Sequence, residues 1–311
     1  MIDHFYRALC ALCPAANNPV VAIVVSDEAD TYRPEFEYLA GVLQAAGKRV
    51  YVAHPSELEM LDNHAVGLHV KGDCVRVEII YRFWELFDMS TLECADVILA
   101  AVEQGTVIVS PPMKSYQEEK LNLALLHHPM LEDYWREVLP KSAWRTLQRI
   151  VPHSWVMDPV NLPPNAVLDA PHVRGKPIRS WEQLAEASQK ERDLILKMSG
   201  FHESAWGARS VVLGSDVSKN DWQAAILSAC EMAKTNLHIL QKYHKPTRVE
   251  HPVYRDDGTI VPMSGRVRLC PYYAILDGLA QLSAVLATVC PADKKIIHGM
   301  SDAALLPCKV K

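Results

Sequence analysis

The sequence predicts an α/β protein in which a parallel-sheet domain is followed by a strand-rich α+β half. Over the first ~110 residues, apolar runs of strand length alternate with amphipathic runs of helix length. A proline-rich stretch at 159–177 then interrupts the chain and predicts a loop or hinge. From Asp193 onward, most segments have the pattern of strands. These three observations define the fold class.

The first part of the chain justifies the parallel sheet element by element. Val20–Val25 is a continuous apolar run, typical of a strand covered on both faces. Pro34–Lys48 has apolar residues at helical spacing, and proline suits the first turn of a helix. The other expected elements are a strand at 49–53, a short helix from Ser56, a strand at 75–81, a helix at 91–103 and a strand at 106–109. Repeated strand–helix units of this length predict parallel pairing.

The second part is expected to begin with helices and to continue with strands. The helical segments are 116–127, 131–150 and, after a cap at Ser180, 181–189. The expected strands are 194–197, 211–213, 238–242, 248–254, 260–270 and 280–289. Ser218 and Asp221 indicate a capped helix start, and Asp256-Asp257-Gly258 indicates a hairpin turn. We therefore predict domains at 1–112 and 113–311, the second with a helical segment, 113–190, and a strand-rich part, 191–311.

Composition argues against several classes of function. The net charge is −5 and 22% of residues are charged, so no basic excess indicates nucleic-acid binding. The apolar run 276–290 is interrupted by polar residues, so no membrane span is expected. The amino terminus lacks the layout of a secretory signal, which favours the cytoplasm. The eight cysteines are scattered, and the C-x-x-C of Cys10 and Cys13 lacks a second ligand pair, so reduced thiols are expected.

Two segments in the strand-rich part suggest a nucleotide site. Leu194–Lys197 is an apolar strand that ends in lysine and is followed by a loop containing serine and glycine. About 40 residues later, another apolar strand ends in Gln241, Lys242 and Tyr243. A lysine supplies a compact charge for a phosphate oxygen, and a strand end offers backbone groups that can read an adenine edge. Phosphoryl transfer depends mainly on such positioning and charge neutralisation.

These residues resemble the ATP-grasp superfamily, in the circularly permuted form found in glutathionylspermidine synthetase. The resemblance extends over nearly the whole chain at the level of element order. Residues 20–109 are similar to the Rossmann-like pre-ATP-grasp domain, and the remainder is similar to the ATP-grasp domain. The stretches 200–207 and 265–273 are similar to segments of bacterial proteins of this group.

The resemblance implies a set of site residues. Lys120 and Lys197 correspond to the two lysines that contact ATP, and Ser199, Gly200 and Gly207 belong to the loop that covers the phosphates. The hinge that holds adenine and ribose corresponds to Gln241, Lys242 and Tyr243. Arg266 and Arg268 lie on a strand where the superfamily often has an arginine for the γ-phosphate, and they are the expected catalytic residues.

Each of these residues also has an ordinary structural interpretation. A lysine at a strand end is usually a solvated surface group. A helix rich in glutamate and lysine, such as the one expected around Lys120, is usually an exposed face. Arg266 and Arg268 alternate along a strand, which is also the pattern of a solvent-facing row. The lysine, the loop and the distant Gln-Lys-Tyr favour nucleotide contact only in combination.

The sequence departs from the family in the segment that binds magnesium. ATP-grasp enzymes hold Mg²⁺ with an acidic residue and a Glu-x-Asn pair, because hard oxygen ligands neutralise the phosphates. In permuted members this segment precedes the Rossmann-like domain, and no Glu-x-Asn occurs near the start of this chain. We therefore expect either an incomplete chain or a loss of metal-dependent catalysis. The metal ligands are not identified, although ATP and Mg²⁺ are the cofactors that the resemblance implies.

The expected function is an ATP-dependent ligation of a carboxylate to an amine through an acyl phosphate. The expected partners are thus a nucleotide and a small-molecule substrate. The alternative is a non-catalytic nucleotide-binding or regulatory module with a degenerate ATP-grasp fold. A third possibility, a sugar-nucleotide or dinucleotide enzyme using the first domain, is disfavoured because the turn after Val25 lacks Gly-x-Gly-x-x-Gly.

Overall fold

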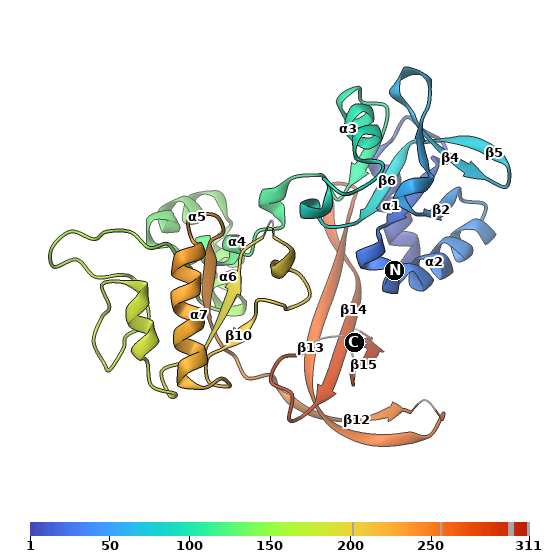
Figure 1. Cartoon of the computed structure of the whole chain (residues 1–311). Coiled ribbons are helices and arrows are strands. Elements are labelled where there is room, and N and C mark those ends of the chain that lie inside the picture. Colours follow the sequence, from blue (N-terminus) through green and yellow to red (C-terminus); the bar gives the residue numbers. More distant parts are fainter. Residues whose placement is uncertain (201, 256, 298–301, 310–311) are drawn as a thin grey trace. The chain divides into compact units, whose positions relative to one another are not determined.

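The computed structural model describes residues 1–200, 202–255, 257–297 and 302–309. The chain forms two compact units (Figure 1). The first unit combines residues 1–113 with 245–311, and the second unit is residues 114–244. Residues 245–311, which the sequence analysis grouped with the nucleotide-binding part, therefore fold together with the amino-terminal part. The structure is α/β, with one parallel sheet and three antiparallel sheets, in agreement with the predicted class.

A parallel sheet of four strands forms the centre of the first unit. Its order is β2 (Val50–Ala53), β1 (Val21–Val25), β6 (Ile79–Phe83) and β7 (Ile108–Ser110). Every residue of β1 is fully buried, as expected for a strand covered on both faces. One face packs against α1 (Ile2–Leu12) and α2 (Arg33–Ala45), and the other packs against α3 (Ala95–Glu103). The expected strand–helix alternation is present here.

A small antiparallel sheet follows β2 in the chain. Its strands are β3 (Leu58–Met60), β4 (Val66–Val70) and β5 (Asp73–Val77). The expected helix from Ser56 is wrong, because the segment is a 3-10 turn capped by His54 and is followed by β3. The expected strand at 75–81 divides at Glu78, where β5 ends and β6 begins to pair with β1. A stretch with the pattern of one strand thus contains a change of pairing partner.

The carboxy-terminal part of the first unit is a long antiparallel sheet. Its order is β12 (Arg248–Tyr254), β13 (Ile260–Leu276), β14 (Leu279–Pro291) and β15 (Ala304–Pro307). Asp277 and Gly278 both have positive φ and make the tight turn between β13 and β14. In the expected hairpin turn before β13, Asp256 lies outside the described residues, and Gly258 has a φ of 80°. His4 Nδ1 lies 3.1 Å from Ser283 Oγ and connects α1 to this sheet.

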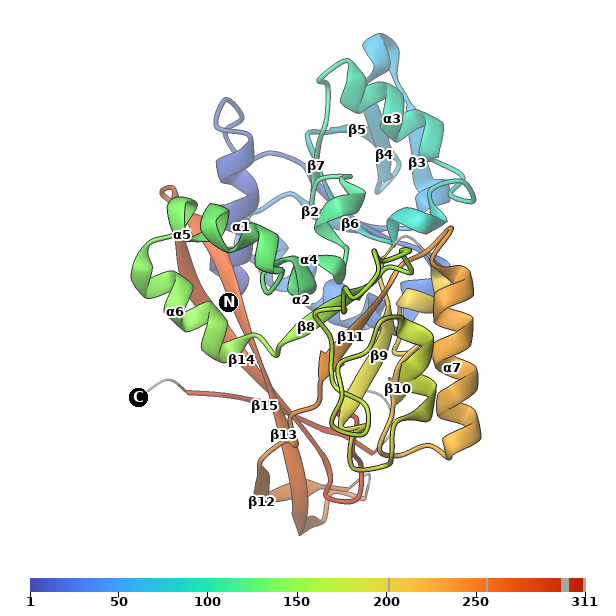
Figure 2. The ribbon, with the colours of Figure 1, turned by 90° about the vertical axis from the view of Figure 1, so that its left-hand side faces the viewer.

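The second unit contains an antiparallel sheet with the order β10 (Val212–Leu213), β9 (Leu194–Met198), β11 (His238–Lys242) and β8 (Ser154–Met157). One face packs against α7 (Lys219–Met232) and the 3-10 segment Trp181–Glu186. Leu194 and Leu196 point toward that face. Because side chains alternate along a strand, Lys197 points to the opposite face. Figure 2 shows α7 beside β9 and β10.

The helical part of the second unit is shorter and more interrupted than expected. Within 116–127 only α4 (Leu121–Leu125) is α-helical, and it packs against β8 and β11. The expected helix 131–150 is broken at Pro140 into α5 (Glu132–Val138) and α6 (Lys141–Ile150), because proline removes a backbone donor. Among the described residues, no helix is both long and apolar enough to cross a lipid bilayer.

Candidate functional site

A chain of hydrogen bonds crosses three strands on the face of the second unit's sheet that points away from α7. The Nζ atom of Lys197 on β9 donates to Oε1 of Gln241 on β11 at 2.7 Å. The Nε2 atom of Gln241 donates to Oγ of Ser154 on β8 at 2.8 Å. Gln241 and Ser154 are 5% and 2% exposed. The two site residues that the sequence analysis placed on separate strands, Lys197 and Gln241, are therefore in direct contact.

Lys120 lies close enough to Lys197 to influence its charge. Burial lowers the pKa of Lys197 below the ordinary lysine value, and the positive charge of Lys120 lowers this pKa further. Lys120 immediately precedes α4, and its Nζ donates to the carbonyl oxygen of Ala205 at 2.6 Å. We refer to Lys120 and Lys197 as the lysine pair. Two neighbouring ammonium groups, one of them poorly solvated, favour binding of an anion.

Ser199 and Gly200 hold the end of β9 against the segment before α4. The Ser199 hydroxyl accepts from the backbone N–H of Leu121 at 2.9 Å and donates to the carboxylate of Glu119. A Cβ atom on Gly200 would lie 3.2 Å from the carbonyl oxygen of Glu118 and 3.2 Å from Cδ of Glu119. The glycine therefore permits a close approach of two backbones. The Ser199 hydroxyl positions the segment that carries Lys120.

The loop after Gly200 turns sharply at its far end. Gly207 and Ala208 both have a φ of 63°, a conformation that glycine adopts without strain. The guanidinium group of Arg209 lies over the ring of Trp206, 5.4 Å from its centroid. Phe201, in the same loop, lies outside the described residues. Gly207 therefore has a conformational role in a turn that carries an aromatic–cation contact.

The end of β11 differs from the expected adenine-reading edge. The backbone N–H of Lys242 donates to the carbonyl of His153 at 2.8 Å, and that of Tyr243 donates to the carbonyl of Asp193 at 3.1 Å. Both N–H groups are thus already bonded to the residues that immediately precede β8 and β9. The assignment of Gln241, Lys242 and Tyr243 to an adenine hinge stays a prediction, and the backbone groups left to it at Lys242 and Tyr243 are carbonyl acceptors. The Lys242 side chain remains exposed.

Histidine and tryptophan rings next to this strand end were missed in the sequence analysis. The His153 ring lies between those of His127 and Trp155, with centroid distances of 4.6 Å and 4.4 Å. Burial lowers the pKa of His153, and the neighbouring His127 lowers it further. Ser154 was also missed, because its strand is short and its partner Gln241 lies 87 residues away. Only the alternation in Ser154–Met157 could have indicated this strand.

Arg266 and Arg268 belong to the first unit, whereas the lysine pair belongs to the second. Arg266 is 5% exposed and donates to the carbonyl oxygens of Ala292 and Pro246 at 2.8 Å and 2.9 Å. Arg268 donates to the carbonyl of Ile297 at 3.2 Å. These bonds fasten the middle of β13 to the backbone of neighbouring segments. The solvent-facing row that was the structural alternative for both arginines does not describe Arg266, which is buried.

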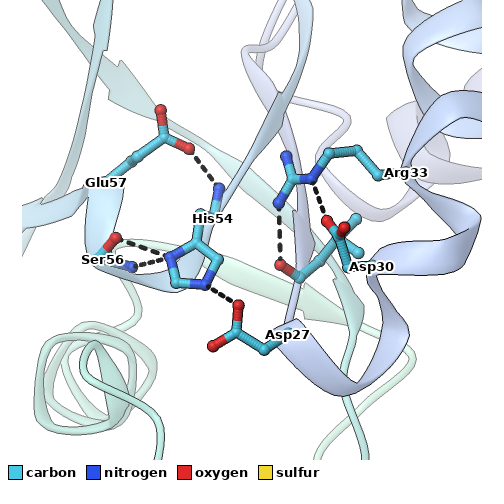
Figure 3. A network of polar contacts seen from close by, with 7 residues as sticks. Asp27, Asp30, Arg33, His54, Ser56 and Glu57 are labelled. Atoms are coloured by element: carbon cyan, nitrogen blue, oxygen red, sulfur yellow. Dashed lines mark hydrogen bonds and ion pairs between the residues drawn. The ribbon is translucent and has the colours of Figure 1, made fainter.

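A second polar network lies after β1 and β2, at the edge of the parallel sheet where open α/β sheets bind ligands. Figure 3 shows His54 between Ser56 and Asp27, with Nδ1 2.7 Å from Ser56 Oγ and Nε2 3.2 Å from Asp27 Oδ1. Arg33 connects Asp30 to the backbone carbonyl of Val25. The Asp27 side chain is 96% exposed, so the network fixes two loops and does not enclose a substrate.

Comparison with protein-family models gives no match, and comparison with curated protein sequences also gives none. Among the solved structures that match, three examples cover most of this chain. D-alanyl-alanine synthetase A from Vibrio cholerae has 11% identity and a TM-score of 0.40, with 94% of this chain and 74% of that chain covered. A glutathione synthetase-like effector from Globodera pallida has 10% identity and a TM-score of 0.48, with 98% and 56% covered.

The third structure is macrocyclase MdnC with precursor peptide MdnA from Microcystis aeruginosa, at 12% identity and a TM-score of 0.38, with 89% of each chain covered. This chain spans 56% of the length of the Globodera protein.

Proposed function

We propose that the second unit binds the phosphates of ATP at the lysine pair. The observation that carries this proposal is the half-buried Lys197, which faces Gln241 and shares its surroundings with the charge of Lys120. A lone buried ammonium group is costly to desolvate, and a second cation beside it increases the cost. A phosphate chain would neutralise both charges. Adenine would lie toward the end of β11, near the rings of His153 and Trp155.

The proposed reaction joins a carboxylate to an amine. An oxygen of the carboxylate attacks the γ-phosphorus of ATP, ADP leaves, and an acyl phosphate forms. The amine nitrogen then attacks the acyl carbon, loses a proton and displaces inorganic phosphate. In this scheme the lysine pair orients the phosphates and offsets their charge, which is the main protein contribution to phosphoryl transfer. Mg²⁺ would accompany the nucleotide and neutralise oxygens of its β- and γ-phosphates.

The alternative function is a nucleotide-binding module without catalysis. One observation favours it: no Glu-x-Asn pair of the kind that holds Mg²⁺ in ATP-grasp enzymes occurs near the start of the chain. Such a module would bind the nucleotide through the same lysines and release no ADP. We expect either activity to take place in the cytoplasm, with a nucleotide and a small molecule as partners.

Binding of ATP to the full chain tests the shared part of both proposals. In isothermal titration calorimetry, Lys197→Met and Lys120→Met should each weaken ATP binding by about ten- to a hundredfold, the loss expected for one charge-assisted contact. Lys234→Met is the matched control, because Lys234 is an exposed lysine of the same unit and should bind ATP like the wild type. Equal affinity in all four proteins would contradict the proposed site.

Release of ADP separates the two functions. The wild type is incubated with ATP, Mg²⁺ and mixtures of amino acids or polyamines, and ADP is measured with and without these acceptors. Acceptor-dependent ADP that disappears in Lys197→Met supports the ligase. Tight binding of ATP without any ADP release supports the module.

A further inference from the structure

Three side chains of different chemistry meet on one face of the small sheet β3–β4–β5 in the first unit. Glu59 Oε1 lies 3.1 Å from His69 Nε2 and 3.0 Å from Cys74 Sγ. One ligand atom from each of these residues lies within 4.8 Å of the others. All three residues are exposed. Among the described residues, this is where a carboxylate, an imidazole and a thiol come together; we refer to it as the β3–β5 cluster.

The strand register explains why the three side chains converge. Glu59 is opposite Gly67, and His69, two residues further along β4, is opposite Cys74. Residues that face each other, or that are two apart on a strand, point to the same side of a sheet. Gly67 lies between them, and a Cβ atom there would be only 2.9 Å from Cys74 Sγ. The missing side chain therefore gives the Cys74 sulfur room to lean toward Glu59.

We propose that the β3–β5 cluster binds a divalent transition-metal ion of the zinc type. Imidazole nitrogen, thiolate sulfur and carboxylate oxygen are the three ligand types that Zn²⁺ takes in proteins. Tetrahedral zinc at normal bond lengths separates its ligand atoms by about 3.3–3.7 Å, so the two short distances here need to open only slightly. A thiolate and a carboxylate also carry two negative charges, which balance a divalent cation. Since the side chains are exposed, water would complete the coordination.

The same contacts can be explained by hydrogen bonds without a metal ion, and an experiment can distinguish this explanation from metal binding. The Cys74 thiol and the Nε2–H group of His69 can each donate a hydrogen bond to Glu59. Binding of zinc would replace the proton on sulfur with the metal and release it to solvent. Sulfur also gives selectivity, because Mg²⁺ and Ca²⁺ prefer oxygen ligands. The metal-free arrangement predicts no saturable uptake of Zn²⁺ or Co²⁺.

The test uses the full chain, with reduced thiols, without nucleotide, and Zn²⁺ or Co²⁺ as the probe. Calorimetry should show one equivalent of Zn²⁺ bound, and bound Co²⁺ should give a thiolate charge-transfer absorption band. Cys74→Ser and His69→Gln should each weaken Zn²⁺ binding by about tenfold or more, and Cys74→Ser should abolish the band. Cys308→Ser and His172→Gln are matched controls, because both residues are exposed in the structure, and they should behave like the wild type.

Three results would overturn the proposal: no saturable binding to the wild type, equal affinity in Cys74→Ser and His69→Gln, or equal competition by Mg²⁺. Circular dichroism of the metal-free variants checks that they fold, and Glu59→Gln offers a third ligand variant if one of the others does not. The result is independent of the proposed nucleotide site, since neither lysine of the pair is changed and ATP is absent. Failure of one proposal therefore leaves the other intact.

Discussion

At the scale of single residues, the environment of Lys197 determines how nucleotide binding should depend on pH. Burial and the neighbouring Lys120 both lower the pKa of Lys197. Only the protonated side chain attracts phosphate, so the affinity should decrease as pH rises through this lowered pKa. The decrease should begin at a lower pH than for an ordinary lysine, which titrates near 10.5.

Replacement by arginine provides the test, because a guanidinium group stays protonated over this range. We expect ATP affinity in Lys197→Arg to decline less between neutral and alkaline pH than it does in the wild type. The affinities are measured by calorimetry at several pH values in one buffer system. Identical pH profiles for the two proteins would show that Lys197 does not titrate in the site.

His238 should make the second unit sensitive to acid. It is 6% exposed, its Nδ1 has no hydrogen-bond partner among the described residues, and burial lowers its pKa below 6.5. Below pH 6.5, His238 therefore binds a proton more readily in the unfolded chain than in the folded chain. Stability should be greatest above pH 6.5 and should be lost as pH falls below it, by at most about 1.4 kcal/mol per pH unit for one proton.

Urea unfolding followed by tryptophan fluorescence checks this expectation, since every tryptophan except Trp84 lies in the second unit. The free energy of unfolding should decrease between pH 7 and pH 5, and the decrease should be smaller in His238→Gln. If the free energy of unfolding of His238→Gln depends on pH as it does in the wild type, His238 is not the cause of the acid sensitivity.

At the scale of elements, the sequence pattern correctly predicted those helices and strands whose positions depend on residues close in the chain. The start of α7 at Ser218, the buried strand β1 and the strand β12 have the expected positions. Errors arose where a distant partner decides the structure. Nothing within 75–81 indicates that the chain changes partner at Glu78, and nothing local assigns β12–β15 to the first unit. For the site, sequence analysis named Lys197 and Gln241, but it missed Ser154, whose role depends on the pairing of β8 with β11.

The cap of α7 offers a test at this scale. The Ser218 hydroxyl accepts a hydrogen bond from the backbone N–H of Asp221 at 3.1 Å. Ser218→Ala leaves that N–H without its partner and should lower the free energy of unfolding by about 1 kcal/mol. Ser228→Ala, in the interior of the same helix, should be neutral or slightly stabilising, because alanine has the higher helix propensity. Urea unfolding of both variants provides the comparison, and equal stabilities would argue against the cap.

At the scale of the whole molecule, the two proposed sites lie in different units and should respond to different ligands. Hydrogen–deuterium exchange of the full chain can locate each response. ATP should slow exchange in β9, β11 and α4 of the second unit, where the lysine pair is held. Zn²⁺ should slow exchange in β3, β4 and β5 of the first unit. Protection of β3–β5 by ATP alone, or of β9 and β11 by Zn²⁺ alone, would contradict the assignment of sites.

The composition of the first unit from two distant stretches of chain has a consequence for its synthesis. The ribosome delivers α1 and the parallel sheet early, but β13 and β14, which pair with each other and lie beside α1, are translated only after residue 244. The second unit is continuous in sequence, so it can fold on the ribosome before the carboxy-terminal strands of the first unit have been synthesised. The amino-terminal part can then complete its folding only after β13 and β14 have emerged from the exit tunnel.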